Sequence, residues 1–269
     1  MFDFSTRLLQ TLIYCVLSAI LLIGCTATMQ DTGASLSGSA KTKALRVGVS
    51  ANAPPLAYKT GGKLQGLEID LATQLGTYLG RDIRFVEMRW DKQIAALEEG
   101  KIDIIMSGMT ITPKRAYRVA FSNPYMRSGQ ILLVRMDQAG RFSSGIYSLM
   151  ASKPAIGTIK NTTGDFFITK TIHGANITRF SKSEQAVKAL IDNKIDVFVH
   201  DAPVVCHLAA LNEQNKLTPI LQMATDELLA WPVNKMNGEL LDQLNGFLVT
   251  KSRDGGLEST IKRWVPYLQ

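Results

Sequence analysis

Residues 96–104 read Ala-Leu-Glu-Glu-Gly-Lys-Ile-Asp-Ile, and residues 189–197 read Ala-Leu-Ile-Asp-Asn-Lys-Ile-Asp-Val. Both follow one pattern: Ala-Leu, two variable residues, Gly or Asn, Lys-Ile-Asp and a β-branched residue. Each stretch predicts the end of a helix, a Gly or Asn in the left-handed conformation just after it, and a short buried strand. The chain is therefore expected to contain two α/β units with the same internal plan.

Each repeat also has a similar strand upstream. Residues 45–49 and 155–159 are short and apolar with a central glycine, Gly48 and Gly157, and each leads into a loop and a helix. Between the first strand and the first repeat, leucines recur at a spacing that marks one face of a helix over residues 64–79. Strands that alternate with helices predict parallel sheets.

The carboxyl ends of the two repeat strands are the expected place for a ligand, because ligands of parallel sheets bind beyond those ends. The first strand runs into Ser-Gly-Met-Thr at residues 107–110, and the second into His-Asp-Ala-Pro at residues 200–203. Both ends are polar. Two facing lobes would bring them to opposite sides of one cleft.

The first 44 residues predict export and a lipid anchor. An apolar run at residues 8–23 is too short to be a comfortable membrane span. It ends in Leu-Ile-Gly-Cys at residues 22–25, which resembles the lipobox of bacterial lipoprotein signal peptides. We expect residues 1–24 to be the signal peptide, Cys25 to be lipidated and residues 25–44 to be a flexible tether. The alternative is an uncleaved anchor or a plain secretory signal, and either places the body outside the cytoplasm.

Composition argues against several classes of function. The chain has 269 residues, of which 46% are hydrophobic and 20% charged, so one or two globular domains are expected. The formal net charge of +7 is dispersed without a basic run, which gives nucleic-acid binding little support. Three cysteines are too few for a disulfide framework, and Cys206 is expected to be a buried structural residue. No metal and no cofactor are expected.

The loop after the first repeat strand carries groups that suit a carboxylate. A helix is predicted to begin at Pro113, with Thr112 as its N-cap. Gly108 permits close backbone approach, and Thr110 offers a hydroxyl. Arg115 offers a planar fork that binds a carboxylate through two parallel charge-assisted hydrogen bonds. Taken alone, an arginine in a first helical turn is usually a solvated surface residue.

Asp201, at the end of the second repeat strand, can accept hydrogen bonds from an ammonium group. On spacing alone it is more often the N-cap of the helix that follows. The pair changes the interpretation. A cationic fork on one lobe and a carboxylate on the other match the zwitterion of a free amino acid.

In their order along the chain, several motifs resemble the polar amino acid class of bacterial extracellular solute-binding proteins, the receptors of ABC importers. The resemblance covers nearly all of residues 45–268, and its markers lie at residues 66–71, 100–103, 108–115, 121–125 and 238–264.

This resemblance implies an α/β, two-lobed periplasmic-binding-protein fold of type II with two crossover hinge strands. Lobe one would comprise residues 45–134 plus 225–269, and lobe two residues 135–224. It further implies a monomeric periplasmic or cell-surface receptor, anchored by its lipid, that hands a free polar amino acid to a membrane-embedded ABC permease.

The resemblance also implies roles for individual residues. By position, Arg115 matches the family arginine that binds the α-carboxylate, and Asp201 the aspartate that binds the α-ammonium. Gly108 and Thr110 match ligand contacts beside that arginine, and Thr163 matches a lobe-two contact whose alternative role is a helix N-cap. In the implied mechanism, the ligand docks on lobe one and hinge closure brings lobe two onto it.

Around the ligand side chain, the sequence departs from the family pattern. Trp90 falls where many relatives place an aromatic wall, whereas Ala53 and Ala57 replace an aromatic and an acidic residue of the usual first-strand motif. Ser50 stands where several binders of cationic or amide side chains carry an aspartate, which argues against a cationic ligand. Lys160 resembles the lysine of glutamine binders. A glutamine-like ligand, or another with a polar uncharged or acidic side chain, is therefore preferred.

Two other functions are compatible with the resemblance. Cyclohexadienyl dehydratases resemble the same family but use a carboxylic acid near the lobe-two aspartate as general acid. Residues 202–206 contain no acid, and His200 is the obvious proton donor nearby, which is weak support for catalysis. A ligand-sensing adaptor is the second alternative. Binding without turnover is the expectation.

Overall fold

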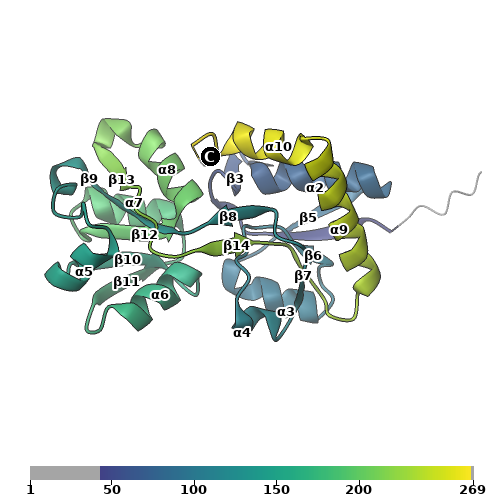
Figure 1. The fold of residues 1–269 in the computed structure, drawn as a ribbon, viewed down its shortest axis with the longest axis horizontal. Helices are drawn as coiled ribbons and strands as arrows, with labels where there is room; N and C mark the ends of the chain where they lie inside the picture. The colour runs from purple at the N-terminus through teal and green to yellow at the C-terminus, as the bar shows by residue number, and fades with distance from the viewer. Residues whose placement is uncertain (1–42, 268–269) are drawn as a thin grey trace, which may run out of the picture. The chain divides into compact units, whose positions relative to one another are not determined.

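The computed structural model describes residues 43–267. The predicted signal peptide, the lipidation site Cys25 and nearly all of the predicted tether lie outside these residues. Within residues 43–267, none of the helices has the length and apolarity needed to cross a bilayer. Two five-stranded sheets lie on either side of a pair of connecting strands (Figure 1). They define lobe one and lobe two.

The sheet of lobe one has the strand order β5 (Ile83–Glu87), β1 (Leu45–Val49), β6 (Ile104–Ile105), β15 (Pro232–Val233) and β7 (Ala120–Phe121). β1 pairs in parallel with β5 and β6, whereas β15 is antiparallel to its neighbours. Its helices are α2 (Leu67–Leu79), α3 (Gln93–Glu98), α4 (Pro113–Ala116), α9 (Gly238–Arg253) and α10 (Gly256–Trp264), with a short 3-10 helix η1 (Trp90–Lys92). A three-stranded hairpin sheet consists of β2 (Asn52–Ala53), β3 (Ala57–Thr60) and β4 (Lys63–Gln65).

The sheet of lobe two repeats this plan, with the order β11 (Asn176–Phe180), β10 (Ala155–Ile159), β12 (Val197–Asp201), β9 (Gln130–Arg135) and β13 (Leu217–Ile220). β10 is parallel to its two neighbours and β9 is antiparallel to its own. The helices are α5 (Ile146–Ser152), α6 (Thr163–Thr171), α7 (Ser183–Ile191) and α8 (Ala202–Leu211), and two 3-10 helices are η2 (Met136–Gln138) and η3 (Glu213–Asn215).

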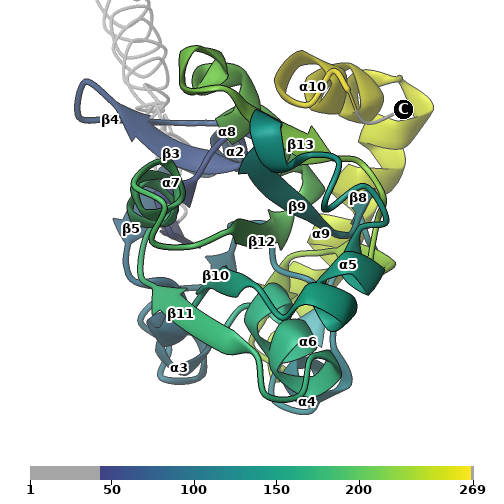
Figure 2. The same ribbon diagram turned by 90° about the vertical axis from the view of Figure 1, so that its left-hand side faces the viewer.

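Helices cover both faces of the lobe-two sheet, with α5 and α6 on one side and α7 and α8 on the other (Figure 2). The alternation of side chains along β9 fits these two layers. Leu132 and Val134 pack in the cluster that contains α5 and α6, whereas Ile131 and Leu133 belong to the cluster that contains α7 and α8. Because both faces are covered, residues 131–134 of the strand are all apolar.

The quoted repeat has the predicted local structure in both lobes. The helices α3 and α7 are each followed by a left-handed residue, Gly100 with φ +66° and Asn193 with φ +57°. In each copy the amide of the next lysine donates to the carbonyl five residues earlier, at 2.8 Å. The repeat aspartates, Asp103 and Asp196, accept the N–H of the strand residue two before the central glycine, at 2.8 and 2.9 Å. The aspartates therefore tie each repeat to its upstream strand.

The repeat isoleucine explains why each upstream strand has a central glycine. A Cβ on Gly48 would lie 2.4 Å from Cδ1 of Ile102, and one on Gly157 would lie 2.5 Å from Cδ1 of Ile195. Both distances are far inside van der Waals contact. The isoleucine thus fills the space that the glycine leaves, and the two motifs depend on each other.

The connecting strands β8 (Met126–Ser128) and β14 (Glu227–Leu229) pair antiparallel with each other. They are the two predicted crossover strands, and the predicted type II fold is confirmed. The boundary between the lobes differs from the prediction. Lobe one was expected to extend to residue 134, whereas β9 pairs with β12 and β13 and so belongs to lobe two. One residue, Gly129, separates β8 from β9, so no change in local pattern marks the transition.

Candidate functional site

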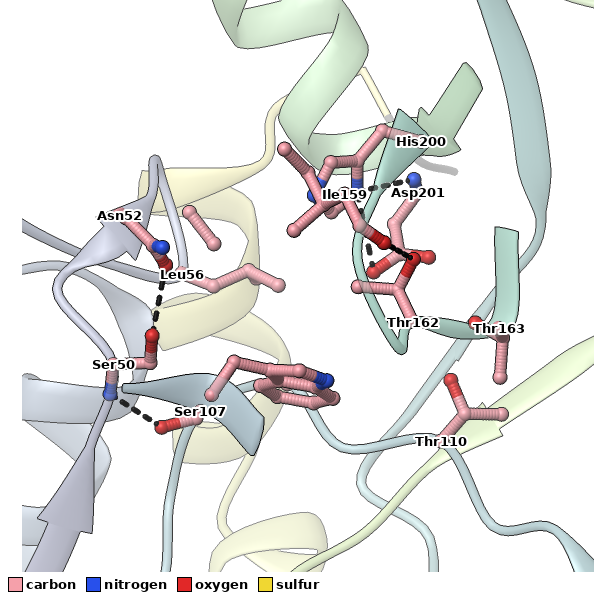
Figure 3. Close-up of a pocket in the computed structure, with 13 residues that line it drawn as sticks. Ser50, Asn52, Leu56, Ser107, Thr110, Ile159, Thr162, Thr163, His200 and Asp201 are labelled. Atoms are coloured by element: carbon pink, nitrogen blue, oxygen red, sulfur yellow. Dashed lines mark hydrogen bonds and ion pairs between the residues drawn. The ribbon is translucent and has the colours of Figure 1, made fainter. Parts of the chain in front are cut away.

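A cavity with an empty volume of about 430 Å³ lies between the lobes, where the carboxyl ends of their parallel strands face each other (Figure 3). Its lining combines residues of both lobes: Ser50, Asn52, Ala53, Leu56, Trp90, Ser107, Gly108, Thr110, Ile159, Thr162, Thr163, His200 and Asp201. The predicted residues Ser50, Trp90, Gly108, Thr110 and Asp201 are among them, as is Thr163.

Arg115 lies behind this lining. Its helix α4 begins as predicted, since Thr112 accepts the N–H of Arg115 at 3.2 Å and Pro113 occupies the first turn. The guanidinium lies over the ring of Trp90, 5.3 Å from its centroid, and Nη1 donates to the backbone oxygen of Thr110 at 2.8 Å. The residue is buried, not solvated. Burial lowers the pKa of Arg115 from 12.5, and the charges of Asp201 and Glu227 oppose that effect.

Asp201 occupies the N-cap position of α8, but its side chain does not cap the helix. Its Oδ1 instead accepts a hydrogen bond from Nε2 of Gln130. Burial and the nearby charge of Glu227 raise the pKa of Asp201 to about 7, while Gln130 and Arg115 act in the opposite direction. A nearby cation would therefore stabilise the ionised form of this carboxylate.

His200 presents a hydrogen-bond donor to the cavity. Its Nδ1 accepts the backbone N–H of Asp201 at 2.7 Å, so the neutral ring carries its proton on Nε2. Burial lowers the pKa of His200 to about 4, so the ring is neutral at physiological pH. The sequence left open a role for His200 as a proton donor, whereas its geometry suits a neutral hydrogen-bond donor.

The two predicted threonine contacts, Thr110 and Thr163, have different hydrogen-bonding roles. The hydroxyl of Thr110 donates to Oε2 of Glu227 at 2.6 Å, which leaves its lone pairs free to accept from a ligand. The N-cap of α6 is Thr162, whose Oγ1 accepts the N–H of Asp165 at 3.3 Å. Thr163 is thus released from capping, and it lines the cavity beside Gln130.

A buried glutamate supports the loop that carries Gly108. Glu68, at the start of α2, accepts the N–H of Gly108 at 2.5 Å and the hydroxyl of Tyr125 at 2.6 Å through Oε1. Its Oε2 accepts Nε1 of Trp231 at 2.9 Å. Burial raises the pKa of Glu68 to about 7. Gly108 itself has φ +70°, and a Cβ there would lie 2.5 Å from Cδ1 of Leu56, so the position requires glycine.

Contacts across the cleft hold the lobes together in this structure. Nε1 of Trp90 donates to the carbonyl of Asn161 at 3.1 Å. Nδ2 of Asn52 donates to the carbonyl of Ser181 at 3.0 Å, and the hydroxyl of Ser183 donates back to the carbonyl of Asn52 at 3.0 Å. Trp90 therefore contacts the opposite lobe as well as Arg115.

The two predicted contacts of the ligand side chain, Ser50 and Lys160, differ in burial. Ser50 is buried: its backbone N–H donates to Oγ of Ser107 at 2.9 Å, and its hydroxyl donates to Oδ1 of Asn52 at 2.8 Å. Lys160 is exposed and lines a wider groove outside the cavity. The predicted contact of Lys160 with the ligand side chain stays a prediction.

Sequence reasoning missed Gln130 and Glu227, which both lie beside the cavity. Oε1 of Glu227 accepts Nε2 of Gln130 at 2.9 Å and the hydroxyl of Thr225 at 2.8 Å. The signal available in the sequence was a charged residue at the start of the otherwise apolar stretch 228–233. Among the described residues, no three His, Cys, Asp or Glu side chains gather as a metal site would require.

The profile of the bacterial extracellular solute-binding proteins, family 3, matches residues 45–267. The L-cystine-binding protein TcyJ of Escherichia coli (strain K12) is 25% identical over 225 residues, which cover 82% of each protein. A crystal structure of a mutant ArgBP from T. maritima superposes with a TM-score of 0.75 at 31% identity, covering 82% of this chain and 94% of that one. A crystal structure of an ancestral amino acid-binding protein, a precursor of cyclohexadienyl dehydratase, gives a TM-score of 0.75 at 32% identity, with coverages of 82% and 95%.

Proposed function

The chain belongs to the bacterial extracellular solute-binding proteins, family 3, and from that premise we propose that it binds a free amino acid between its lobes and delivers it to an ABC importer. One observation carries the proposal. A buried carboxylate, Asp201 of lobe two, lines the cavity, and a buried guanidinium, Arg115 of lobe one, lies behind the lining; they are close enough for each to alter the other's pKa. Opposite charges placed in this way fit a zwitterion.

In the proposed complex, the α-carboxylate binds Arg115 and the α-ammonium binds Asp201. Nη1 of Arg115 already bonds to Thr110, so the remaining guanidinium donors serve the ligand. The free lone pairs of Thr110 add an acceptor for the ammonium, and Thr163 adds a hydroxyl from lobe two. Closure excludes water, which strengthens each charge-assisted bond.

For the ligand side chain, we propose a polar group that accepts a hydrogen bond, as the amide of glutamine does. The donor is Nε2 of His200, with Ser50 and Asn52 nearby in the lining. Asp201 is the acidic residue among those that line the cavity, and its proposed partner is the ammonium. A cationic side chain would therefore lack a carboxylate of its own. Relatives are named for binding cystine, arginine, histidine and glutamine, so the family varies this part of the site.

The proposed setting is extracytoplasmic. The family description is extracellular, and the lipobox-like sequence that ends in Cys25 supports a lipid anchor. We propose a monomer in the periplasm or at the cell surface. Mass spectrometry of the membrane-extracted protein should find an acylated Cys25 at the mature N-terminus, and an unmodified or uncleaved N-terminus would contradict the anchor.

A thermal-shift screen against the twenty amino acids tests the binding proposal. A ligand at 100 times its Kd adds about 2.7 kcal/mol to the free energy of unfolding, which is a readily measured shift in Tm. Glutamine is expected to give the largest shift, and calorimetry on the purified protein then gives Kd. A folded protein that no amino acid stabilises would contradict amino acid binding. A larger shift with arginine or lysine would contradict the side-chain preference alone.

One observation favours a second candidate, a dehydratase of the cyclohexadienyl type. The pKa of Asp201, about 7, allows this carboxyl to hold a proton near neutral pH, as a general acid must. A solved structure at 32% identity is described as a precursor of such an enzyme. Incubation with prephenate or arogenate, followed by ultraviolet absorbance, tests this candidate, and absence of product while amino acids bind would exclude it.

A further inference from the structure

Each crossover connection places one buried polar side chain beside the cavity. Gln130 begins β9, one residue after the end of β8, and Glu227 begins β14. We propose that these two are positioning residues, which hold Asp201 and Thr110 in the orientation that the ligand's ammonium group requires. The crossover connections, about which the lobes move, then determine the affinity for the ammonium group. This inference rests on the proposed amino acid binding.

Gln130 connects the crossover strands to lobe two. It is 1% exposed, and its Nε2 donates to Oδ1 of Asp201 and, at 2.9 Å, to Oε1 of Glu227. The same nitrogen lies 3.2 Å from Oγ1 of Thr163. Its Oε1 is buried and has no hydrogen-bond partner among the described residues. A rotated amide would point that oxygen at two carboxylates, so the carboxylates determine the orientation of the side chain.

Glu227 makes the corresponding connection to lobe one. Its Oε2 accepts the hydroxyl of Thr110 at 2.6 Å, which directs the only hydrogen of that hydroxyl away from the ligand. Its Oε1 accepts both Gln130 and Thr225. Three donors therefore point at the Glu227 carboxylate. One hydrogen-bonded chain therefore runs from Thr110 through Glu227 and Gln130 to Asp201.

The charges of this cluster favour a cation at its centre. Asp201 and Glu227 contribute two carboxylates and Arg115 one guanidinium, while the buried His200 is neutral. The charge of Glu227 and the hydrogen bond from Gln130 have opposite effects on the pKa of Asp201: the first raises it and the second lowers it. Tyr125, the remaining titratable group coupled to Asp201, has its pKa raised well above 10 and stays neutral.

Two substitutions distinguish the proposed positioning role of Glu227 and Gln130 from a purely structural role. Glu227→Gln removes the repelling charge, so the pH below which affinity falls should move down, and the affinity at pH 8 should fall about tenfold or more. Gln130→Met removes the shared donor, so the same midpoint should move up while affinity falls. If Gln130→Met does not fold, Gln130→Asn is used, because the shorter amide cannot reach both carboxylates.

A matched control lies on the same two strands. Arg127 of β8 and Asp226 beside β14 form an ion pair on the solvent side at 2.6 Å, with side chains 75% and 65% exposed. Arg127→Gln breaks a connection between the crossover strands without touching the cavity. Its affinity and pH midpoint should stay at the wild-type values, because exposed ion pairs contribute little.

The experiment is calorimetric titration between pH 5.5 and 8.5 with L-glutamine, L-arginine, L-histidine and L-cystine, continued with the one that binds most tightly. Midpoint shifts in opposite directions for Glu227→Gln and Gln130→Met, with Arg127→Gln unchanged, support the inference. Wild-type affinity and midpoint in both variants, or equal losses without a shift, would overturn it. A folded wild-type protein that binds none of the four, and that none of the twenty amino acids stabilises against heat, overturns the proposed function and the inference together.

Discussion

Replacing Arg115 by glutamine should remove the group that pairs with the ligand's α-carboxylate. Arg115 is 8% exposed, so a carboxylate bound there is shielded from water. One guanidinium nitrogen already bonds to the carbonyl of Thr110 at 2.8 Å, and the other donors remain for the ligand. Removing one partner of a buried charge pair costs about 2–5 kcal/mol, since the other charge is left without compensation. The expected loss of affinity is about 30-fold to several thousandfold.

Arg115→Lys is the more informative substitution because it retains the charge. A lysine cannot form two parallel bonds to a carboxylate, and it loses the contact of the guanidinium over the Trp90 ring, 5.3 Å from the centroid. Loss of one charge-assisted hydrogen bond, worth about 1.5–3 kcal/mol, predicts an affinity about 10- to 100-fold lower. If charge alone mattered, the lysine variant would bind nearly as well as the wild type.

Calorimetry at pH 7.5 with the tightest-binding amino acid measures both losses. Arg118→Gln is the control, because this neighbouring arginine is exposed and pairs with Glu98 on the surface. Its affinity should stay within about twofold of the wild type. Circular dichroism and thermal unfolding establish that each variant is folded. A folded Arg115→Gln variant with affinity within threefold of the wild type would refute the assignment of this residue.

Three further predictions follow from the buried acids and the side-chain pocket. Because the pKa of Asp201 is about 7 and the ammonium needs the ionised form, affinity should fall about tenfold from pH 8 to pH 6. Calorimetry at both values checks this, and Asp201→Asn should bind weakly with no such change; equal wild-type affinities would contradict the prediction. The pKa of Glu68 rises from 4.5 to about 7 on folding, so its stabilising effect is complete below pH 4.5 and is lost as pH rises through 7. The free energy of unfolding of the wild type should therefore decrease between pH 4.5 and pH 8. Urea unfolding at the two pH values should show that Glu68→Gln makes this decrease about 3 kcal/mol smaller, and an unchanged decrease would contradict the prediction. Finally, Ser50→Asp should increase the affinity for arginine about tenfold or more, because it adds a carboxylate to the pocket. Competition between arginine and glutamine measures this change. Unchanged selectivity would argue that the ligand side chain lies elsewhere.

Local sequence predicted much of the fold because its signals act over a few residues. A left-handed Gly or Asn after a helix, a Pro113 in a first helical turn and an apolar strand are each determined by backbone sterics and side-chain periodicity. The repeat allowed the same local structure to be predicted twice, and Ile102 fits Gly48 in the same way as Ile195 fits Gly157. The polar residues at the strand ends then predicted most of the cavity lining.

The sequence by itself therefore determined two similar α/β lobes, their polar strand ends and a candidate pair of opposite charges. Tertiary structure decided which lobe takes β9, that Lys160 lies outside the cavity, and that Glu227 meets Gln130 across 97 positions of the chain. The physical reason is the range of the forces involved. Backbone conformation depends on neighbours in sequence, whereas strand pairing and the cost of burying a charge depend on whatever group the fold brings within a few ångströms.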